Sequence, residues 1–388
     1  MPLKVGILAG EPSGDALGAG LMRALQSRCS NDQEPIQFMG VGGPHMQAQA
    51  LQCFADIDSL AVNGFRDPIL QLPRLVLLLR HLINEFVAAD IDVFVGIDFN
   101  VFNFILEAAL KRRGIKTIHY VSPSVYAWRA GRTKRVAKSA DLLLCLYPFE
   151  PDFYLGLPVK AEFVGHPLAD EISPGSVDGS ARAAARVALE IEDEQTVLAL
   201  LPGSRSGEVA LMIEPFLAAA KLFSEAHPNT MVVIPCLRPA LRARIEQALV
   251  GAPGLRVTLY DGHARRALIA ADIALVKSGT STLEAMLLRC PMVVGYRLGA
   301  LSYQLAKRVV RTPYVALPNI LAGRELVPEL LQDAATGPAL AKALEQQLHK
   351  ARNSRDYAEA AVHLHAQLGQ GADAKAAAAV LELLGHSP

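Results

Sequence analysis

Strand-like apolar runs alternate with helix-like patterns along nearly the whole chain, and this alternation restricts the fold more than any other feature of the sequence. Each run is followed by a longer segment whose apolar residues have helical spacing. Regular alternation of this kind predicts parallel β-sheets covered by helices on both faces. The runs lie at residues 5–9, 37–41, 93–97, 117–121 and 142–146 in the first half, and at 197–201, 231–234, 257–260, 273–276 and 292–296 in the second.

A break in this pattern lies near the middle of the chain. Residues 165–168 (GHPL) and 173–176 (SPGS) are rich in turn formers. A chain of 388 residues is longer than a single core usually organises, so we expect two domains joined here. The sequence therefore predicts two doubly wound, Rossmann-like α/β domains. Ligands of open α/β sheets bind beyond the carboxyl ends of the strands, so the loops after the runs carry the candidate site residues.

The charge composition excludes a globally basic nucleic-acid-binding protein. Lysine and arginine together number 38, and so do aspartate and glutamate, which leaves a formal net charge of zero. The five cysteines are widely spaced and form no C-x-x-C pair, which favours a reducing compartment. No apolar run reaches the roughly 18 residues of a membrane span, and the N-terminal run is too short for a signal peptide. We therefore expect a cytoplasmic protein.

Residues 276–284 (VKSGTSTLE) have the pattern of a strand end, a turn of small residues and a helix start. Unpaired N–H groups and the positive end of the helix dipole make such a start a binding site for a diphosphate. Glu284, one turn into the helix, is placed to bind a ribose. The alternative is that the hydroxyl residues only cap the helix. The candidate diphosphate ligands are Ser278, Gly279 and Thr280.

Arg205 lies in the loop after the run at 197–201. Its guanidinium has the fork geometry that suits two phosphate oxygens. The alternative is an ordinary surface arginine. Since both loops follow strands of the same domain and both favour anions, together they indicate a nucleotide-diphosphate site.

Two loops of the first domain are candidates for the second substrate. The loop at residues 10–15 directly follows the first run, and its glycines permit a tight turn before a helix start that favours anions. An ordinary strand-to-helix turn is the alternative. Asp98 ends the run at 93–97, where a carboxylate is well placed to act as a general base. Capping of the next helix is an equally common role.

Residues 69–83 have an unusually apolar helical pattern, flanked by Arg66, Arg74 and Arg80. A helix that is apolar on nearly every side is most often buried. Alternatively, it lies at a membrane surface or holds an acyl chain.

Two further patterns point away from nucleic acid and metal. Aromatic and basic residues between Ser122 and Lys138 suit either nucleic-acid bases or phosphate groups, and the neutral chain favours phosphate. Of two Asp-x-Asp pairs, residues 90 and 92 precede their strand and so lie at the wrong edge of the sheet for the site. The pair at residues 56 and 58 is only slightly better placed. We therefore predict no metal site.

Seven short motifs occur in order along the chain: residues 9–15 (AGEPSGD), 40–44 (GVGGP), 120–129 (YVSPSVYAWR), 201–205 (LPGSR), 278–286 (SGTSTLEAM), 290–297 (CPMVVGYR) and 317–326 (LPNILAGREL). Together they resemble the lipid-A-disaccharide synthase family. The resemblance implies an inverting glycosyltransferase of the GT-B type, with two domains facing across a cleft. It also implies a Gram-negative bacterium and the cytoplasmic face of its inner membrane, where the protein would be peripheral.

The resemblance implies particular substrates. UDP-2,3-diacylglucosamine would react with 2,3-diacylglucosamine 1-phosphate (lipid X) to give the lipid A disaccharide 1-phosphate and UDP. A reaction of this kind does not require a metal ion, so we expect no metal and no cofactor. Monomer and homodimer both stay open.

Site residues follow from the same resemblance. Asp98 resembles the family's essential carboxylate, to which we assign the general-base role toward the 6-hydroxyl of the acceptor, and Asn319 matches an asparagine needed for activity. Residues 1–168 would bind the acceptor and 169–359 the donor, with the C-terminal helix at 360–388 packing back on the first domain. The acceptor residues would be Gly10, Glu11, Ser13, Gly14, Asp15 and Ser122, and the donor residues Arg205, Ser278, Gly279, Thr280 and Glu284.

The chain departs from the family pattern at four positions. Tyr126 stands where tryptophan is commoner, and Val101 where a second acidic residue is expected. Asn63 and Arg66 stand where apolar residues are expected, which weakens membrane docking of the apolar helix. Two rival functions stay open: a UDP-sugar 2-epimerase, which would not need that helix, and a non-catalytic nucleotide-binding module, against which Asp98 argues.

Overall fold

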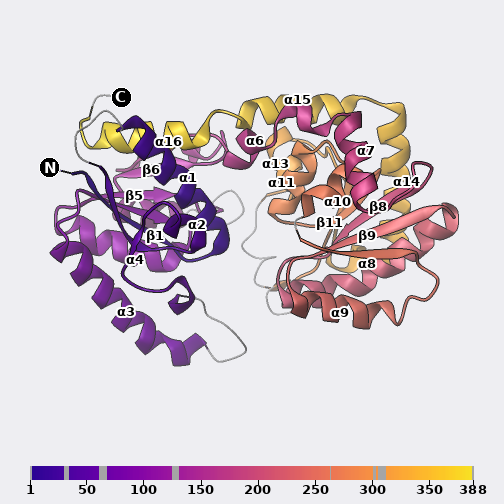
Figure 1. Ribbon diagram of the computed structural model, residues 1–388, viewed down its shortest axis with the longest axis horizontal. Helices are drawn as coiled ribbons and strands as arrows, with labels where there is room; N and C mark the ends of the chain where they lie inside the picture. The colour runs from indigo at the N-terminus through magenta and orange to yellow at the C-terminus, as the bar shows by residue number, and fades with distance from the viewer. Residues whose placement is uncertain are drawn as a thin grey trace. The chain divides into compact units, whose positions relative to one another are not determined.

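The computed structural model describes residues 2–29, 35–60, 68–124, 131–262, 264–299, 303–304 and 312–386. The chain forms two compact units, one of Met1–Asp170 with Gln367–Pro388 and one of Glu171–Ala366. In Figure 1 the strands of the first unit are indigo and purple, and those of the second are magenta to orange. The assignment of acceptor to the first unit and donor to the second stays a prediction.

The first unit is built on a seven-stranded sheet in which every recorded pairing is parallel. Its strand order is β3-β2-β1-β4-β5-β6-β7. The strands are β1 (Lys4–Ala9), β2 (Gln37–Val41), β3 (Gln52–Cys53), β4 (Val93–Ile97), β5 (Lys116–Tyr120), β6 (Leu142–Cys145) and β7 (Lys160–Phe163).

Helices cover both faces of this sheet. Alternation along β1 sends Val5, Ile7 and Ala9 to one face, where they join a core with α1 and α16, and sends Leu8 to the other. The yellow α16 lies beside the indigo α1 in Figure 1. The helices are α1 (Pro12–Arg28), α2 (Pro44–Gln47), α3 (Pro68–Ala88), α4 (Asn100–Lys111), α5 (Gly131–Ser139), α6 (Pro167–Glu171) and α16 (Ala372–Leu383), with short 3₁₀ turns at Ile57–Ser59 and Pro151–Tyr154.

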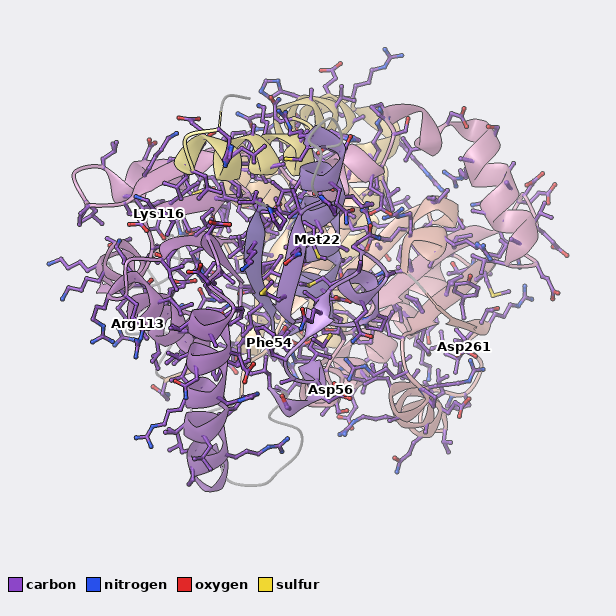
Figure 2. All side chains as sticks on the ribbon, turned by 60° about the vertical axis from the view of Figure 1, so that its left-hand side comes forward. Met22, Phe54, Asp56, Arg113, Lys116 and Asp261 are labelled. Carbon is purple, nitrogen blue, oxygen red and sulfur yellow. The ribbon has the colours of Figure 1, made fainter. Side chains whose placement is uncertain are left out.

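Aromatic rings fill much of the second face. Phe86 of α3 lies between Phe54 and Phe94, with ring centroids 5.3 and 5.0 Å apart and edge-on geometry. Figure 2 shows Phe54 between the sheet and α3, and Met22, which belongs to α1, on the opposite face of the sheet. Both faces of the sheet are therefore buried, as the apolar runs predict.

The second unit is built on a six-stranded sheet of order β10-β9-β8-β11-β12-β13, also with parallel pairings. Its strands are β8 (Thr196–Leu201), β9 (Thr230–Cys236), β10 (Val257–Asp261), β11 (Ile273–Lys277), β12 (Met292–Tyr296) and β13 (Glu329–Leu331). Its helices are α7 (Gly179–Ala188), α8 (Ser206–Ala226), α9 (Pro239–Leu249), α10 (Ala264–Ala270), α11 (Thr280–Leu287), α13 (Leu317–Ala322) and α14 (Gly337–Asn353), with 3₁₀ turns at Pro174–Val177 and Gln332–Ala334. α15 (Asp356–Leu368) begins in this unit and ends in the first.

Helix α8 covers one face of the second sheet through a periodic set of buried apolar residues. Val209, Met212, Phe216 and Phe223 recur at helical spacing and are fully buried. They pack against Leu198 and Leu200 of β8 and against α14. The helix therefore turns a continuous apolar stripe toward the strands.

Every predicted strand run is a strand of one of these sheets, which confirms the predicted class of two doubly wound α/β units. The sequence missed β3, β7 and β13. All three lie at sheet edges, are two to four residues long and are at most partly buried. Edge strands of this length need no apolar run, so they leave no pattern to detect.

Each sheet has one position where the strand order reverses. In the first unit it lies between β1 and β4, and in the second between β8 and β11. The connections leaving two such strands go to opposite faces of the sheet, so the carboxyl ends of the pair are the expected ligand site. The sequence-predicted loops follow these four strands.

Candidate functional site

The loops after β1 and β4 are in contact in the first unit. A Cβ atom built on Gly10 would lie 2.5 Å from Cγ of Phe99. The ring of Phe99 thus covers the backbone of Gly10, and only glycine permits this approach. The structure therefore brings the predicted acceptor loop at 10–15 beside Asp98.

Asp98 sits on a backbone that L-amino acids rarely adopt. Asp98 and Phe99 both have φ of +45°, where each non-glycine residue costs on the order of 1–2 kcal/mol. Fully buried Asn103 holds this kink, since its Nδ2 donates to the carbonyls of Ile97 (3.2 Å) and Asp98 (2.9 Å). Strained backbone of this kind clusters at functional sites.

The carboxylate of Asp98 is half-buried and oriented. Asn100 donates from Nδ2 to Oδ1 of Asp98 at 2.9 Å. The backbone N–H of Asp98 donates to the carbonyl of Tyr120 on the neighbouring β5 at 2.8 Å. One oxygen of the carboxylate is therefore held by Asn100, and the side chain stays partly open to solvent, as a general base requires.

Asp15, predicted to bind the acceptor, is 1% exposed, and both of its carboxylate oxygens accept hydrogen bonds from the protein backbone. Its Oδ1 accepts from the N–H groups of Gly43 (2.8 Å) and Met46 (3.0 Å), and its Oδ2 accepts from that of His45 (2.9 Å). Asp15 therefore fastens the glycine loop after β2 to the start of α1.

The other predicted acceptor residues differ in accessibility. Ser13 is exposed, Glu11 is half-buried at the start of α1, and Gly14 is buried. Ser122 is 5% exposed, and its hydroxyl lies 2.9 Å from that of Tyr154. Ser13 and Glu11 can reach a ligand directly, whereas the Ser122 side chain is engaged within the protein.

In the second unit the start of α11 is open. Gly279, the residue before the helix, has φ of +156° and is exposed, and Thr280 is exposed beside it. The hydroxyl of Ser278 donates to the carbonyl of Val315 (2.9 Å), and that of Thr282 donates to the carbonyl of Gly279 (2.8 Å). The side chains of Ser278 and Thr282 thus bond to carbonyls and leave the helix start to a ligand.

The remaining donor residues lie around this helix start. Arg205 is exposed at the beginning of α8, in the loop that follows β8. Glu284 is half-buried one turn into α11, with Oε1 3.5 Å from Nε of Arg265. β8 and β11 are neighbours in the sheet, so the predicted donor loops leave it side by side.

A charged pair between these two loops was not predicted from the sequence. Nζ of Lys277 lies 3.0 Å from Oε1 of Glu208 and 4.9 Å from the ring centroid of Tyr296. Burial alone would raise the pKa of Glu208, but hydrogen bonds from Lys277 and from the loop outweigh it, so this pKa is lowered. A glutamate three residues after the helix N-cap suits a capping role, so the position of Glu208 could have been noticed, whereas its pairing with Lys277, 69 residues away, has no local signal.

Asn319 is fully buried and uses its whole amide group. Its Nδ2 donates to Val327 O (2.8 Å) and Oε1 of Glu329 (2.7 Å), and its Oδ1 accepts from the N–H groups of Leu326 (2.7 Å) and Val327 (2.9 Å). Glu329 in turn accepts from the N–H groups of Val315 and Ala316. Asn319 therefore positions the segment that also holds Ser278, and its predicted importance for activity stays a prediction.

Within the described residues, no group of three or more His, Cys, Asp or Glu side chains could hold a metal ion. Asp56, labelled in Figure 2, caps a 3₁₀ turn, because its Oδ1 accepts from the N–H of Asp58 at 2.9 Å. Among the helices that the structure describes, none is long and apolar enough to cross a membrane. Tyr126, Asn63 and Arg66, which depart from the family pattern, lie outside the described residues.

A model of the protein family described as lipid-A-disaccharide synthetase matches residues 5–382. The chain belongs to this family. A lipid-A-disaccharide synthase from Sodalis glossinidius is 49% identical over 384 residues, covering 99% of this chain and 98% of that protein. One from Azotobacter vinelandii is 46% identical, covering 98% of each. The predicted resemblance is confirmed, and with it the predicted class of enzyme, a glycosyltransferase of lipid A disaccharide synthesis.

Solved structures support the GT-B fold of this lipid-A-disaccharide synthase family member. A UDP-GlcNAc 2-epimerase from Neisseria meningitidis, bound to UDP-GlcNAc, has a TM-score of 0.64 at 14% identity, covering 99% of each chain. MurG from Acinetobacter baumannii has a TM-score of 0.53 at 14% identity, again covering 99% of each. Identity this low shows only a shared fold, so the similarity to the epimerase does not indicate epimerase activity. Membership of the lipid-A-disaccharide synthetase family decides between the predicted glycosyltransferase and its epimerase rival.

Proposed function

We propose that the first unit binds 2,3-diacylglucosamine 1-phosphate, that the second binds UDP-2,3-diacylglucosamine, and that Asp98 is the catalytic base. Asp98 removes the proton of the acceptor 6-hydroxyl as that oxygen attacks the anomeric carbon of the donor. The bond from the anomeric carbon to the diphosphate breaks, UDP leaves, and the configuration inverts. The observation that carries this proposal is the strained, half-buried Asp98, oriented by Asn100 at the strand reversal of the first sheet.

The departing UDP gains negative charge, which the second unit can stabilise. The exposed start of α11 at Gly279 offers N–H groups and the positive end of the helix dipole. Arg205, exposed in the neighbouring loop, adds a guanidinium. Fixed positive groups of this kind lower the barrier for a leaving anion, which is the basis for expecting a metal-independent reaction.

Exposed apolar side chains on α4, which begins two residues after Asp98, and on the neighbouring α3 support a lipid acceptor. Val101 and Ile105 of α4 lie one helical turn apart and are 71% and 50% exposed. On the neighbouring α3, Leu72, Val76 and Leu77 are 54%, 44% and 66% exposed. Exposed apolar residues grouped in this way are typical of lipid or membrane contact.

The same surface is the basis for proposing peripheral association with the cytoplasmic face of the inner membrane. One face of α3 is buried, and the exposed apolar residues of the other face support the alternative interpretation of this helix, contact with a membrane or an acyl chain. Leu82 and Phe86 are fully buried against the sheet, whereas Leu72 and Leu77 face solvent. Arg74 and Arg80 are exposed on the same helix and can pair with anionic lipid headgroups.

The proposal is tested with Asp98→Asn, which keeps the shape of the side chain and removes its basicity. We expect turnover of UDP-diacylglucosamine with lipid X to fall by about 10²–10⁴-fold, because one proton-transfer group is lost. UDP affinity should stay within twofold of wild type, and wild-type turnover should persist in EDTA. Asp58→Asn, which makes the same charge change at an exposed position, is the control.

Three results would count against the proposed function. Unimpaired turnover of the Asp98→Asn protein would remove Asp98 from the mechanism. A strict requirement for a divalent ion would contradict leaving-group stabilisation by Arg205 and α11. Binding of UDP without turnover of any acylated donor would favour a non-catalytic nucleotide-binding module.

A further inference from the structure

The ion pair between Lys277 and Glu208 joins the two loops of the proposed donor site. Lys277 is the last residue of β11, directly before Ser278, and Glu208 lies in the first turn of α8. Their side chains are 14% and 23% exposed, with Nζ and Oε1 3.0 Å apart. Because the pair is largely removed from solvent, its charges are less screened than those of a surface pair.

The second oxygen of Glu208 holds the arginine loop. Oε2 accepts from the N–H groups of Ser204 (3.1 Å) and Arg205 (3.4 Å). One carboxylate therefore bonds both to the loop that follows β8 and to the end of β11. This arrangement also places a negative charge beside the site proposed to bind a diphosphate.

The ammonium group of Lys277 lies close to the exposed start of α11. A Cβ built on Gly279 would be 3.9 Å from Nζ of Lys277. Gly279 has no side chain to separate the two, so an anion held by the N–H groups at the helix start would lie within a few ångströms of the ammonium. At that separation two unit charges interact strongly in partly buried surroundings.

We propose that Lys277 is a further donor-binding residue, whose ammonium group neutralises Glu208 and attracts the diphosphate of the nucleotide sugar. The inference rests on the proposed function, in which the second unit binds a UDP-sugar. Without the ammonium, the carboxylate of Glu208 would repel the diphosphate. Lys277 thus permits Glu208 to tie the two loops together at an anion site.

The proposal is tested on the full-length protein by calorimetric titration with UDP and by steady-state kinetics with the donor. Lys277→Met should weaken UDP binding about 10–100-fold and raise the KM for the donor more than it lowers kcat. Lys277→Arg, which keeps the charge, should stay within about fivefold of wild type. Glu208→Gln should bind UDP at least as tightly as wild type, because a repulsive charge is removed.

A double variant separates charge from tethering. If Lys277 acts by charge, Lys277→Met with Glu208→Gln should recover most of the affinity that Lys277→Met alone loses. Lys350→Met is the matched control. Nζ of Lys350, near the end of α14, lies 3.7 Å from Oδ2 of Asp356, and α14 carries no predicted donor residue. This variant should leave the Kd for UDP within twofold of wild type.

The possible outcomes separate the two proposals. If wild type binds UDP and turns over, but Lys277→Met keeps its UDP affinity within twofold, the assignment of Lys277 is overturned. A double variant as weak as Lys277→Met would show that the lysine only tethers the loops, which also overturns it. If wild type itself binds no UDP, the proposed function fails instead. Should Lys277→Met not fold, as judged by its circular dichroism, weaker UDP binding by Glu208→Gln would still contradict the charge argument.

Discussion

Replacement of Asp15 by asparagine tests whether this predicted acceptor residue organises the site or contacts the ligand. The amide oxygen of asparagine can take the place of Oδ1 and still accept hydrogen bonds from the N–H groups of Gly43 and Met46. The amide nitrogen then takes the place of Oδ2, which in Asp15 accepts a hydrogen bond from the N–H of His45 at 2.9 Å. Two donors would meet, and one hydrogen bond would be lost.

The magnitude follows from the number of bonds and from their charge. A hydrogen bond to a charged group contributes about 1.5–3 kcal/mol to stability, and a neutral one about 0.5–1.5 kcal/mol. Asp15→Asn removes one of three charged bonds and makes the other two neutral, in a side chain that is 1% exposed. We therefore expect the free energy of unfolding of the first unit to fall by about 3.5–6 kcal/mol, and its Tm by roughly 7–24 °C.

Differential scanning calorimetry of the full-length protein measures this change. UDP should raise the Tm of only the unit that binds it, so a titration with UDP assigns the two transitions. The exposed Asp58→Asn variant makes the same charge change and should shift stability by no more than about 0.5 kcal/mol. An unchanged transition for Asp15→Asn, together with a higher KM for the acceptor, would show that Asp15 contacts the ligand, and would refute the organising role.

Two further predictions concern pH and the membrane. Burial raises the pKa of Glu150 to about 8, although the N–H groups of Tyr147 and Leu146 act in the opposite direction. Between pH of about 4.5 and 8 the folded protein keeps a proton that the unfolded chain has released, so its stability falls as pH rises through this window. Glu150→Gln should remove that fall, and parallel pH profiles of variant and wild type in urea unfolding would contradict the assignment. Serine at both Leu72 and Leu77 should reduce flotation with vesicles of anionic phospholipid severalfold at unchanged UDP affinity, whereas equal flotation would exclude contact through this face of α3.

Local pattern was enough to predict the class of fold. A strand buried on both faces needs a short apolar run, and ten such runs separated by helical segments already imply parallel sheets. The edge strands β3, β7 and β13 were not predicted, because a short, partly exposed strand needs no apolar run. The positions of Asp98 and Gly279 at strand ends were likewise predictable, since a strand end is visible in the sequence.

The state of each site residue was not predictable, because it depends on partners far along the chain. Asp15 bonds to residues 43–46, and Asn319 closes a network with Glu329. No local spacing shows that these side chains are occupied. From residue type alone, Asp15 was predicted to bind the acceptor and Asn319 to be needed for activity. In the structure both side chains are buried, and their hydrogen bonds hold loops in place.

Sequence alone thus determined that this protein has two doubly wound α/β units, that it belongs with the lipid-A-disaccharide synthases, and which loops leave the ligand side of each sheet. These properties depend on residue patterns within one element or on motifs in a fixed order. Only the tertiary structure decided that Asp98 stands on a strained kink held by Asn103, and that Lys277 faces Glu208 across two loops. Side chains 69 residues apart meet only after both strands have entered the sheet, and their charge and hydrogen bonding are set by that meeting.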